Sequence, residues 1–142
     1  MKKALMMASV ASMIDLFNMD NIQILGDLGF EVEAACNFEY GSITSQDRVD
    51  EFKQELISSK YKIHHLPISR SVFAIADILK SYKLMKSLCD KNNYSIVHCH
   101  SPIGGVIARF ACREARKKGT KVIYTAHGFH FYKGAPIKNW LI

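Results

Sequence analysis

Several short signatures of common binding sites are missing from this sequence. It contains no G-x-G-x-x-G and no G-x-x-x-x-G-K-[ST] segment, so conventional dinucleotide binding and Walker-type NTP binding lack their phosphate loops. It has no C-x-x-C pair and no H-x-x-x-H pair, and therefore lacks the usual ligand spacing for zinc. Basic residues are not interleaved with aromatic ones, and no helix-turn-helix or RNA-binding signature is present. Nucleic acid is not an expected partner.

Long apolar runs and disulfide patterns are missing as well. No segment approaches the ~18 consecutive apolar residues that a membrane-spanning helix needs. The N-terminus, MKKALMMASVASMIDLF, starts like a signal peptide, but Ser9, Ser12 and Asp15 interrupt its apolar run early. The four cysteines fall inside apparent strands and helices, so we expect reduced core residues. That use of cysteine favours a cytoplasmic protein.

The composition is that of an ordinary globular domain. The chain has 142 residues, of which 49% are hydrophobic and 23% are charged. This length suits one domain that buries its own core. The net charge of +6 would suit nucleic acid, an anionic membrane surface or a phosphorylated ligand, and selects none of them.

Short apolar runs alternate with longer amphipathic ones. Strands are expected at Ala4–Ser9, Glu31–Cys36, Lys62–Pro67, Ser95–His100 and Lys121–Ala126. Helices are expected at Met13–Leu28 with a break near 18–21, Arg48–Ser58, Ala74–Lys91 and Pro102–Lys118. The alternation predicts an α/β fold: a Rossmann-like three-layer domain with a mainly parallel sheet of about five or more strands. The apolar first, fourth and fifth strands should be central and the third peripheral.

Polar segments follow the first, fourth and fifth strands. In open parallel sheets, ligands bind beyond the carboxyl ends of the strands, where the strand order reverses. The loop Ser9–Ser12, the segment His100–Gly105 and the segment His127–Lys133 should therefore face one crevice.

The segment HSPIGG predicts a helix start. Ser101 is the expected N-cap and Pro102 the expected first helical residue. Gly104 and Gly105 allow two interpretations. They expose backbone amides to an anionic or sugar-hydroxyl ligand, or they let the helix pack closely on the sheet.

Histidines gather at the fourth and fifth strands. His98 and His100 alternate with Cys99 and so share one face, and His98, deeper in its strand, is expected to be a hydrogen-bonded core residue. His127 should emerge at the carboxyl end of the fifth strand, where Gly128 frees the backbone to turn. It is a candidate general base or a polar clamp on a sugar or phosphate. The alternative is a capping hydrogen bond to the backbone, and no metal site is expected.

Basic residues lie at helical spacing on one side of the last predicted helix; they are Arg109, Arg113, Arg116 and Lys117. Such a face is ordinarily solvated. The alternative is contact with an anionic membrane surface or an acidic partner.

The segment SIVHCHSPIGGVIARFACREARKKGTKVIYTAHGFHFYKGAP closely resembles the amino-terminal half of bacterial family-4 glycosyltransferases of the GT-B fold. The nearest type acts in capsular and exopolysaccharide synthesis. H-x-H-x-P-x-G combined with T-x-H-G-F-H-F carries the resemblance, and FNMDNIQILGDLGFEVEAACNF fits the same pattern.

The resemblance implies retaining transfer of a sugar from a UDP- or GDP-linked donor to a lipid-linked or saccharide acceptor, at the inner membrane face. Residues 1–142 would be the acceptor-binding domain. The donor would bind mainly to a second Rossmann-like domain, with an E-x7-E motif, that is missing here. We therefore expect the chain alone to be inactive, to need that domain or a partner subunit, and to be able to form a homodimer across the exposed face. No other cofactor is implied.

The resemblance also implies roles for individual residues. His127 would line the catalytic cleft near the transferred sugar, and the first loop would approach the donor phosphates, although SVAS replaces the Gly-Gly of many members. Phe129 and His130 would shape the acceptor-side loop. The candidate catalytic residue is thus His127, and the candidate substrate-binding residues are Ser9, Ser12, His100, Ser101, Gly104, Gly128, Phe129 and His130.

Two other functions fit the same pattern. One is a non-catalytic module that docks a separate catalytic subunit or the membrane surface. The other is an unrelated Rossmann-like nucleotide binder, which tight nucleotide binding by the isolated chain would favour.

Overall fold

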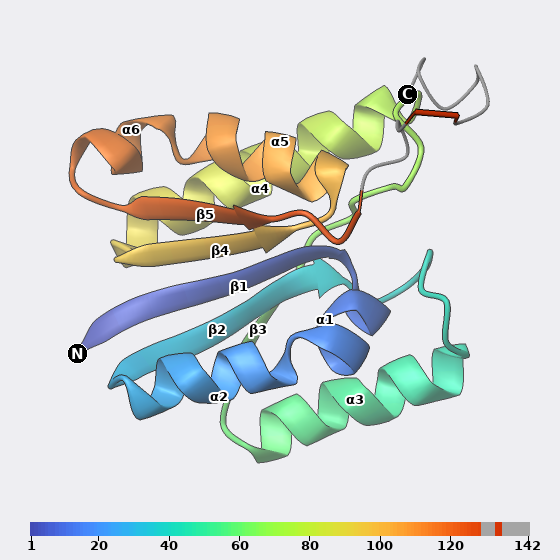
Figure 1. Cartoon of the computed structure of the whole chain (residues 1–142), viewed down its shortest axis with the longest axis horizontal. Helices are drawn as coiled ribbons and strands as arrows, with labels where there is room; N and C mark the ends of the chain where they lie inside the picture. The colour runs from blue at the N-terminus through green and yellow to red at the C-terminus, as the bar shows by residue number, and fades with distance from the viewer. Residues whose placement is uncertain (129–132, 135–142) are drawn as a thin grey trace.

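The chain alternates strands and helices around one parallel sheet (Figure 1). The structure is a computed structural model, which describes residues 1–128 and 133–134. The strands are β1 (Lys2–Val10), β2 (Phe30–Asn37), β3 (Lys62–His65), β4 (Ile96–His100) and β5 (Lys121–Thr125). They pair in the order β3-β2-β1-β4-β5, and every pair is parallel. The predicted α/β fold and its five strands are confirmed.

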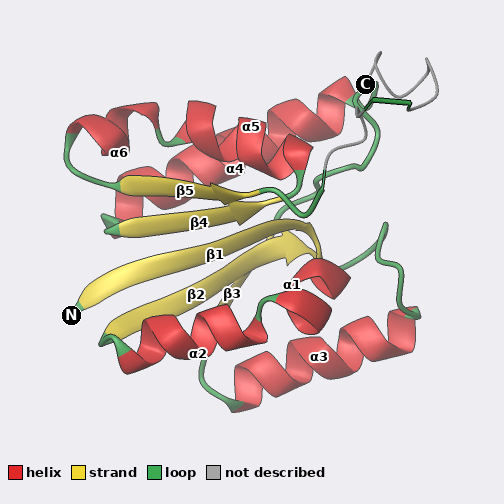
Figure 2. Cartoon of the chain, viewed as in Figure 1, coloured by secondary structure: helices red, strands yellow, loops and turns green. Residues whose placement is uncertain are grey.

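Helices cover both faces of this sheet. They are α1 (Ala11–Phe17), α2 (Met19–Asp27), α3 (Gln46–Ser58), α4 (Ile75–Asn92), α5 (Pro102–Ala111) and α6 (Arg113–Lys117). Figure 2 shows the resulting three layers, with α1, α2 and α3 on one face and α4, α5 and α6 on the other. The chain runs outward from β1 to β3 and then returns to the other side of β1. Right-handed crossovers therefore place the later helices on the opposite face.

The core has two halves, separated by the sheet. On β1, Leu5 and Met7 pack towards α4 and α5, whereas Ala4 and Met6 pack towards α1, α2 and α3. All four cysteines are free and buried, as expected. No helix in the described part of the chain is long and apolar enough to cross a membrane.

Some predicted boundaries are wrong. The expected loop Ser9–Ser12 does not exist, because α1 begins directly after Val10. The expected break in the first helix is confirmed at Asn18, whose side-chain amide donates to the carbonyl of Met13 at 2.8 Å. The expected helix Pro102–Lys118 is instead two helices that meet at Cys112.

The two outermost strands differ from expectation in different ways. β3 lies at one edge, as predicted, but ends at His65 instead of Pro67. β5 was expected near the centre and forms the other edge of the sheet that the described residues build. Its Ile123 is half exposed, because no described helix covers that side of the strand. Apolar composition alone therefore misplaced β5.

A fully buried carboxylate lies on the α4 side of β2. Glu33 accepts hydrogen bonds from the Tyr94 hydroxyl at 2.5 Å and from Lys3 Nζ at 3.2 Å, and pairs with His64 Nε2 at 2.6 Å. Burial by itself raises the pKa of this carboxyl. The hydrogen bonds from its three partners outweigh burial and lower the pKa to about 2.

We expect Glu33→Gln to lower the unfolding free energy at neutral pH and to make that free energy less sensitive to acid. Because the pKa of Glu33 falls from 4.5 to about 2 on folding, its ionised form stabilises the fold above pH 4.5, and that contribution is lost as the pH falls towards 2. At pH 7 the variant should lose about 3 kcal/mol of unfolding free energy. Urea unfolding between pH 7 and 3 measures both effects. Glu31→Gln, at a half-exposed site, is the control and should change stability by less than about 1 kcal/mol. Equal pH slopes for Glu33→Gln and the parent chain would contradict this account.

Candidate functional site

The carboxyl ends of β1 and β4 meet where the strand order reverses. β2 lies on one side of β1 and β4 on the other, so the switch point falls between β1 and β4. Ser9 at the end of β1 and Ser101 after β4 bridge it. The Ser9 amide donates to Ser101 Oγ at 3.2 Å, and the two hydroxyls hydrogen-bond to each other. Segments 92 residues apart are thus joined at the edge where the sequence predicted a crevice.

Ser101 differs from the expected N-cap. Its side chain makes no capping hydrogen bond to α5, because Oγ is engaged with Ser9 instead. Pro102 is the first helical residue, as predicted. The backbone of Ser101 has φ 67° and ψ 148°, a region that costs a non-glycine residue about 1–3 kcal/mol and that occurs preferentially at functional sites.

Gly104 and Gly105 let α5 approach the sheet closely. A Cβ atom on Gly104 would lie 2.9 Å from Ser101 Oγ and 3.6 Å from the Ser9 amide nitrogen. A Cβ atom on Gly105 would lie 2.9 Å from the ring of Tyr124 on β5. The space beside both glycines is therefore filled by protein atoms, and close packing accounts for them.

Ser12, the other serine expected to bind a substrate near the first strand, also makes its hydrogen bonds within the chain. Ser12 Oγ accepts from the amide of Ile43 at 3.1 Å, and the Ser12 amide donates to Ser42 Oγ at 3.3 Å. Ser9 and Ser12 are both buried. Their hydroxyls hold α1 and α5 in place, and both are committed to partners within the chain.

Three histidines form a cluster at the carboxyl ends of β4 and β5. His98 Nε2 lies 2.8 Å from Thr125 Oγ1, which confirms the hydrogen-bonded residue expected there. The rings of His98 and His100 are 4.3 Å apart between centroids, so these residues share one face as predicted. His100 is fully buried, with Nδ1 2.9 Å from His127 Nε2 and Nε2 3.2 Å from Met6 Sδ. The contact between His100 and His127 confirms that HSPIGG and the start of AHGFHF meet.

Burial decides the charge of the inner histidines. Burial, together with the neighbouring His98 and His127, lowers the pKa of His100 to about 3. Burial also lowers the pKa of His98, again assisted by His127. Both side chains are therefore uncharged at neutral pH.

His127 is the exposed member of the cluster. One ring nitrogen is held by the side chain of His100. Among the described residues, the other ring nitrogen has no hydrogen-bond partner and the ring makes no hydrogen bond to the backbone. The ring of Phe17, at the end of α1, lies 6.2 Å away between centroids and is also exposed. Gly128 follows with φ 138°, as a turn after the strand requires. The candidates Phe129 and His130 lie outside the described residues.

The sequence pattern alone did not identify Met6, Thr125 or Phe17. Met6 lies opposite His98 in the β1–β4 register, and Thr125 lies opposite His100 in the β4–β5 register. Strand pairing, rather than a motif, brings these side chains to the histidines. If the strand order is known, the register of the paired strands is the signal that could have identified Met6 and Thr125.

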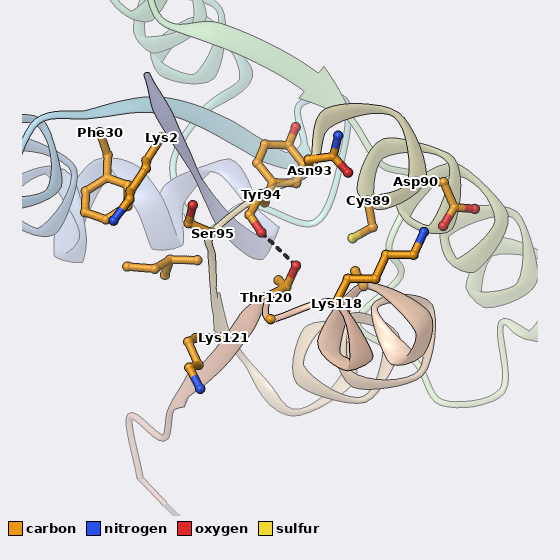
Figure 3. A pocket seen from close by; sticks show the side chains of 13 residues that line it. Lys2, Phe30, Cys89, Asp90, Asn93, Tyr94, Ser95, Lys118, Thr120 and Lys121 are labelled. Carbon is orange, nitrogen blue, oxygen red and sulfur yellow. Dashed lines mark hydrogen bonds between the residues drawn. The ribbon is translucent and has the colours of Figure 1, made fainter.

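Among the described residues, a metal-binding cluster is missing from this edge, and a cavity lies elsewhere. Within residues 1–128 and 133–134, no group of three or more His, Cys, Asp or Glu side chains could hold a metal ion. A cavity of about 420 Å³ lies at the opposite, amino-terminal edge of the sheet, where Thr120 Oγ1 donates to the Tyr94 carbonyl at 2.7 Å (Figure 3). Its Lys118 adjoins the carboxyl end of α6, whose dipole favours positive charge. A ligand is not needed to explain that charge.

We expect Gly105→Ala to destabilise the chain and Gly26→Ala to stabilise it. The new methyl group at position 105 must displace the Tyr124 ring, at a cost of about 1–3 kcal/mol. Gly26, within α2, has no atom within 4 Å of an added Cβ, so alanine there should add about 0.5–1 kcal/mol through helix propensity. Thermal unfolding of both variants measures the difference. Stabilisation by both substitutions would show that α5 does not pack as described.

Comparison with known proteins agrees with the motifs. The sequence model of a family described as "Glycosyl transferase 4-like" matches residues 42–142. The "Putative glycosyltransferase EpsD" of Bacillus subtilis (strain 168) is 44% identical over 141 residues, which are 99% of this chain and 33% of that protein. The chain thus spans about a third of the length of that curated relative.

Solved structures support the fold. MurG of Acinetobacter baumannii superposes with a TM-score of 0.60 at 17% identity, over 89% of this chain and 34% of MurG. A glycosyltransferase from Rickettsia africae ESF-5 gives a TM-score of 0.56 at 16% identity, over 88% of this chain and 29% of that one. Identities this low bear on architecture alone. They confirm the expected Rossmann-like half of a GT-B fold.

Proposed function

The chain belongs to the glycosyl transferase 4-like family, and on that premise we propose that it is the acceptor-side domain of a retaining glycosyltransferase. The observation that carries the proposal is the position of His127. It lies exposed at the carboxyl edge of the sheet, held by the buried His100, beside the switch point where open parallel sheets bind ligands.

The proposed reaction moves a sugar from a UDP- or GDP-linked donor to a lipid-linked or saccharide acceptor, in capsular or exopolysaccharide synthesis. In this proposal His127 is a polar contact in the cleft, and Phe17 forms an apolar wall beside it. Gly128 follows His127 with a positive φ, which glycine adopts readily. The donor would bind mainly to the part of the relatives' length that this chain does not span, which makes residues 1–142 inactive alone.

We also propose that the surface formed by α4 and α5 contacts an anionic membrane on the cytoplasmic side. The apolar side chains exposed on these two helices include Ile75, Leu79, Val106 and Phe110. Basic residues are also exposed on these helices and at the start of α6, which follows α5: Lys80 and Lys83 on α4, Arg109 on α5 and Arg113 on α6. Helices that expose apolar and basic side chains together suit the interface of an anionic bilayer. A lipid-linked acceptor would be reached from this position.

A second surface supports self-association of the isolated chain. Ile123 on β5 and Phe17 on α1 leave apolar area exposed near the proposed cleft. We propose that the remaining part of a longer protein covers this area, and that a second copy of the chain can take its place as a homodimer.

We expect His127→Ala to abolish most transfer in a protein that joins this chain to the remaining part of its relatives' length. Loss of a polar contact made in the transition state should lower kcat/KM at least about 100-fold. Release of nucleotide from a panel of UDP- and GDP-sugars measures this, with the isolated chain as the inactive background. His65→Gln, on the far edge strand, should keep kcat/KM within about 2-fold of the parent protein. A parent protein without turnover that still binds a separate catalytic subunit would support the docking-module alternative instead.

We expect vesicle binding to depend on Arg109 and Arg113. Basic residues near an anionic bilayer contribute about 1 kcal/mol each, so Arg109→Glu with Arg113→Glu should weaken binding to phosphatidylglycerol vesicles at least about 30-fold. Sedimentation of the chain with vesicles gives the affinity. Lys2→Glu with Lys53→Glu changes the net charge equally at sites on β1 and α3, away from this surface, and should have a much smaller effect. Equal losses for the two double variants, or equal binding to phosphatidylcholine vesicles, would argue against a specific membrane surface.

A further inference from the structure

We propose that the buried His100, backed by Met6, fixes the tautomer of His127, placing the ring proton on Nε2 and leaving Nδ1 as a hydrogen-bond acceptor. His100 is then a positioning residue that acts through His127. This inference rests on the proposed function, because it states whether His127 offers a substrate a hydrogen-bond donor or an acceptor.

The starting point is the inner nitrogen of His100. Its Nε2 lies 3.2 Å from the thioether sulfur of Met6, and both side chains are fully buried. A thioether sulfur carries no proton and can only accept a hydrogen bond. His98, the other titratable group beside this ring on β4, has its Nε2 engaged with Thr125 Oγ1 at 2.8 Å. Met6 is therefore the partner that determines which ring nitrogen of His100 carries the proton.

Only one neutral form of His100 suits this environment. A proton on Nδ1 would leave the Nε2 lone pair facing the sulfur, which is a buried acceptor without a donor. A proton on Nε2 is donated to the sulfur and satisfies both atoms. The doubly protonated ring is disfavoured because burial, with the neighbouring His98 and His127, lowers the pKa of His100 to about 3. His100 therefore carries its proton on Nε2.

The state of His100 then decides that of His127. With its proton on Nε2, His100 offers a lone pair at Nδ1, and His127 Nε2 lies 2.9 Å from it. His127 must donate across this contact, so its own proton is on Nε2. In the neutral ring the remaining nitrogen, Nδ1, is an acceptor.

An acceptor at Nδ1 limits the chemical groups that His127 can bind. An acceptor nitrogen binds a hydroxyl or N–H group, whereas a phosphate oxygen, itself an acceptor, would repel it. From the sequence alone, His127 could bind either a sugar or a phosphate. The arrangement of His100 and Met6 favours a sugar hydroxyl.

Nitrogen NMR on the full chain tests the inference without any substrate. Two-bond proton–nitrogen spectra of ¹⁵N-histidine-labelled protein report directly which ring nitrogen is protonated, and His100→Gln and His127→Asn variants assign the signals. We expect His100 and the neutral form of His127 both to be protonated on Nε2. A neutral His127 that carries its proton on Nδ1, or that exchanges equally between the two forms, would overturn the proposal.

Met6→Leu and Met7→Leu provide a matched pair. Both methionines are fully buried on β1, but Met6 faces the histidines and Met7 faces the opposite half of the core. Such swaps conserve volume and usually cost less than about 1.5 kcal/mol, so both variants should fold. Met6→Leu should populate the Nδ1-protonated form of His127, and Met7→Leu should leave the spectrum of the parent chain. Identical spectra for the two variants would overturn the role of Met6.

The two proposals fail in different experiments. An Nε2-protonated His127 in a longer protein that transfers no sugar would contradict the proposed function and leave the tautomer assignment standing. Active transfer by a protein whose neutral His127 is protonated on Nδ1 would contradict the tautomer assignment and leave the proposed function standing.

Discussion

Burial of β1 from Ala4 onward is the constraint on which the rest of this structure depends. Its residues from Ala4 to Ser9 are all buried, because β2 and β4 flank the strand and helices cover both of its faces. A strand in that position must be apolar on both sides, and ALMMA is. The same position makes β1 the place where strand order reverses. The strand that organises the core therefore also organises the candidate site, through Ser9 at its end and Met6 in its middle.

Two fully buried titratable side chains show how the fold treats charge on either side of the sheet. Glu33 stays ionised because Tyr94, Lys3 and His64 surround its carboxylate. His100 stays neutral because its neighbours are a sulfur atom and two further imidazoles, none of which compensates a positive charge. The first arrangement stabilises the fold. In the second, His100 holds one ring nitrogen of the exposed His127 at the candidate site.

The comparisons and the geometry contribute different parts of the functional picture. Membership of a glycosyl transferase 4-like family gives the class of chemistry, whereas the solved structures give only the architecture. Neither assigns a role to a side chain of this chain. The contacts of His127 with His100 and Phe17 supply that level, and they turn a family likeness into statements about particular atoms.

The sequence by itself determined the strands, the parallel α/β class and the edge at which the histidines gather, because these follow from local patterns of two and 3.6 residues and from strand-end positions. It also determined that His98 and His100 share a face. Only the tertiary structure decided that β5 is an edge strand, that Ser101 binds Ser9 instead of capping α5, and that Met6 faces His100. Each of these depends on the register and spacing of segments far apart in the chain, and no local pattern contains that information.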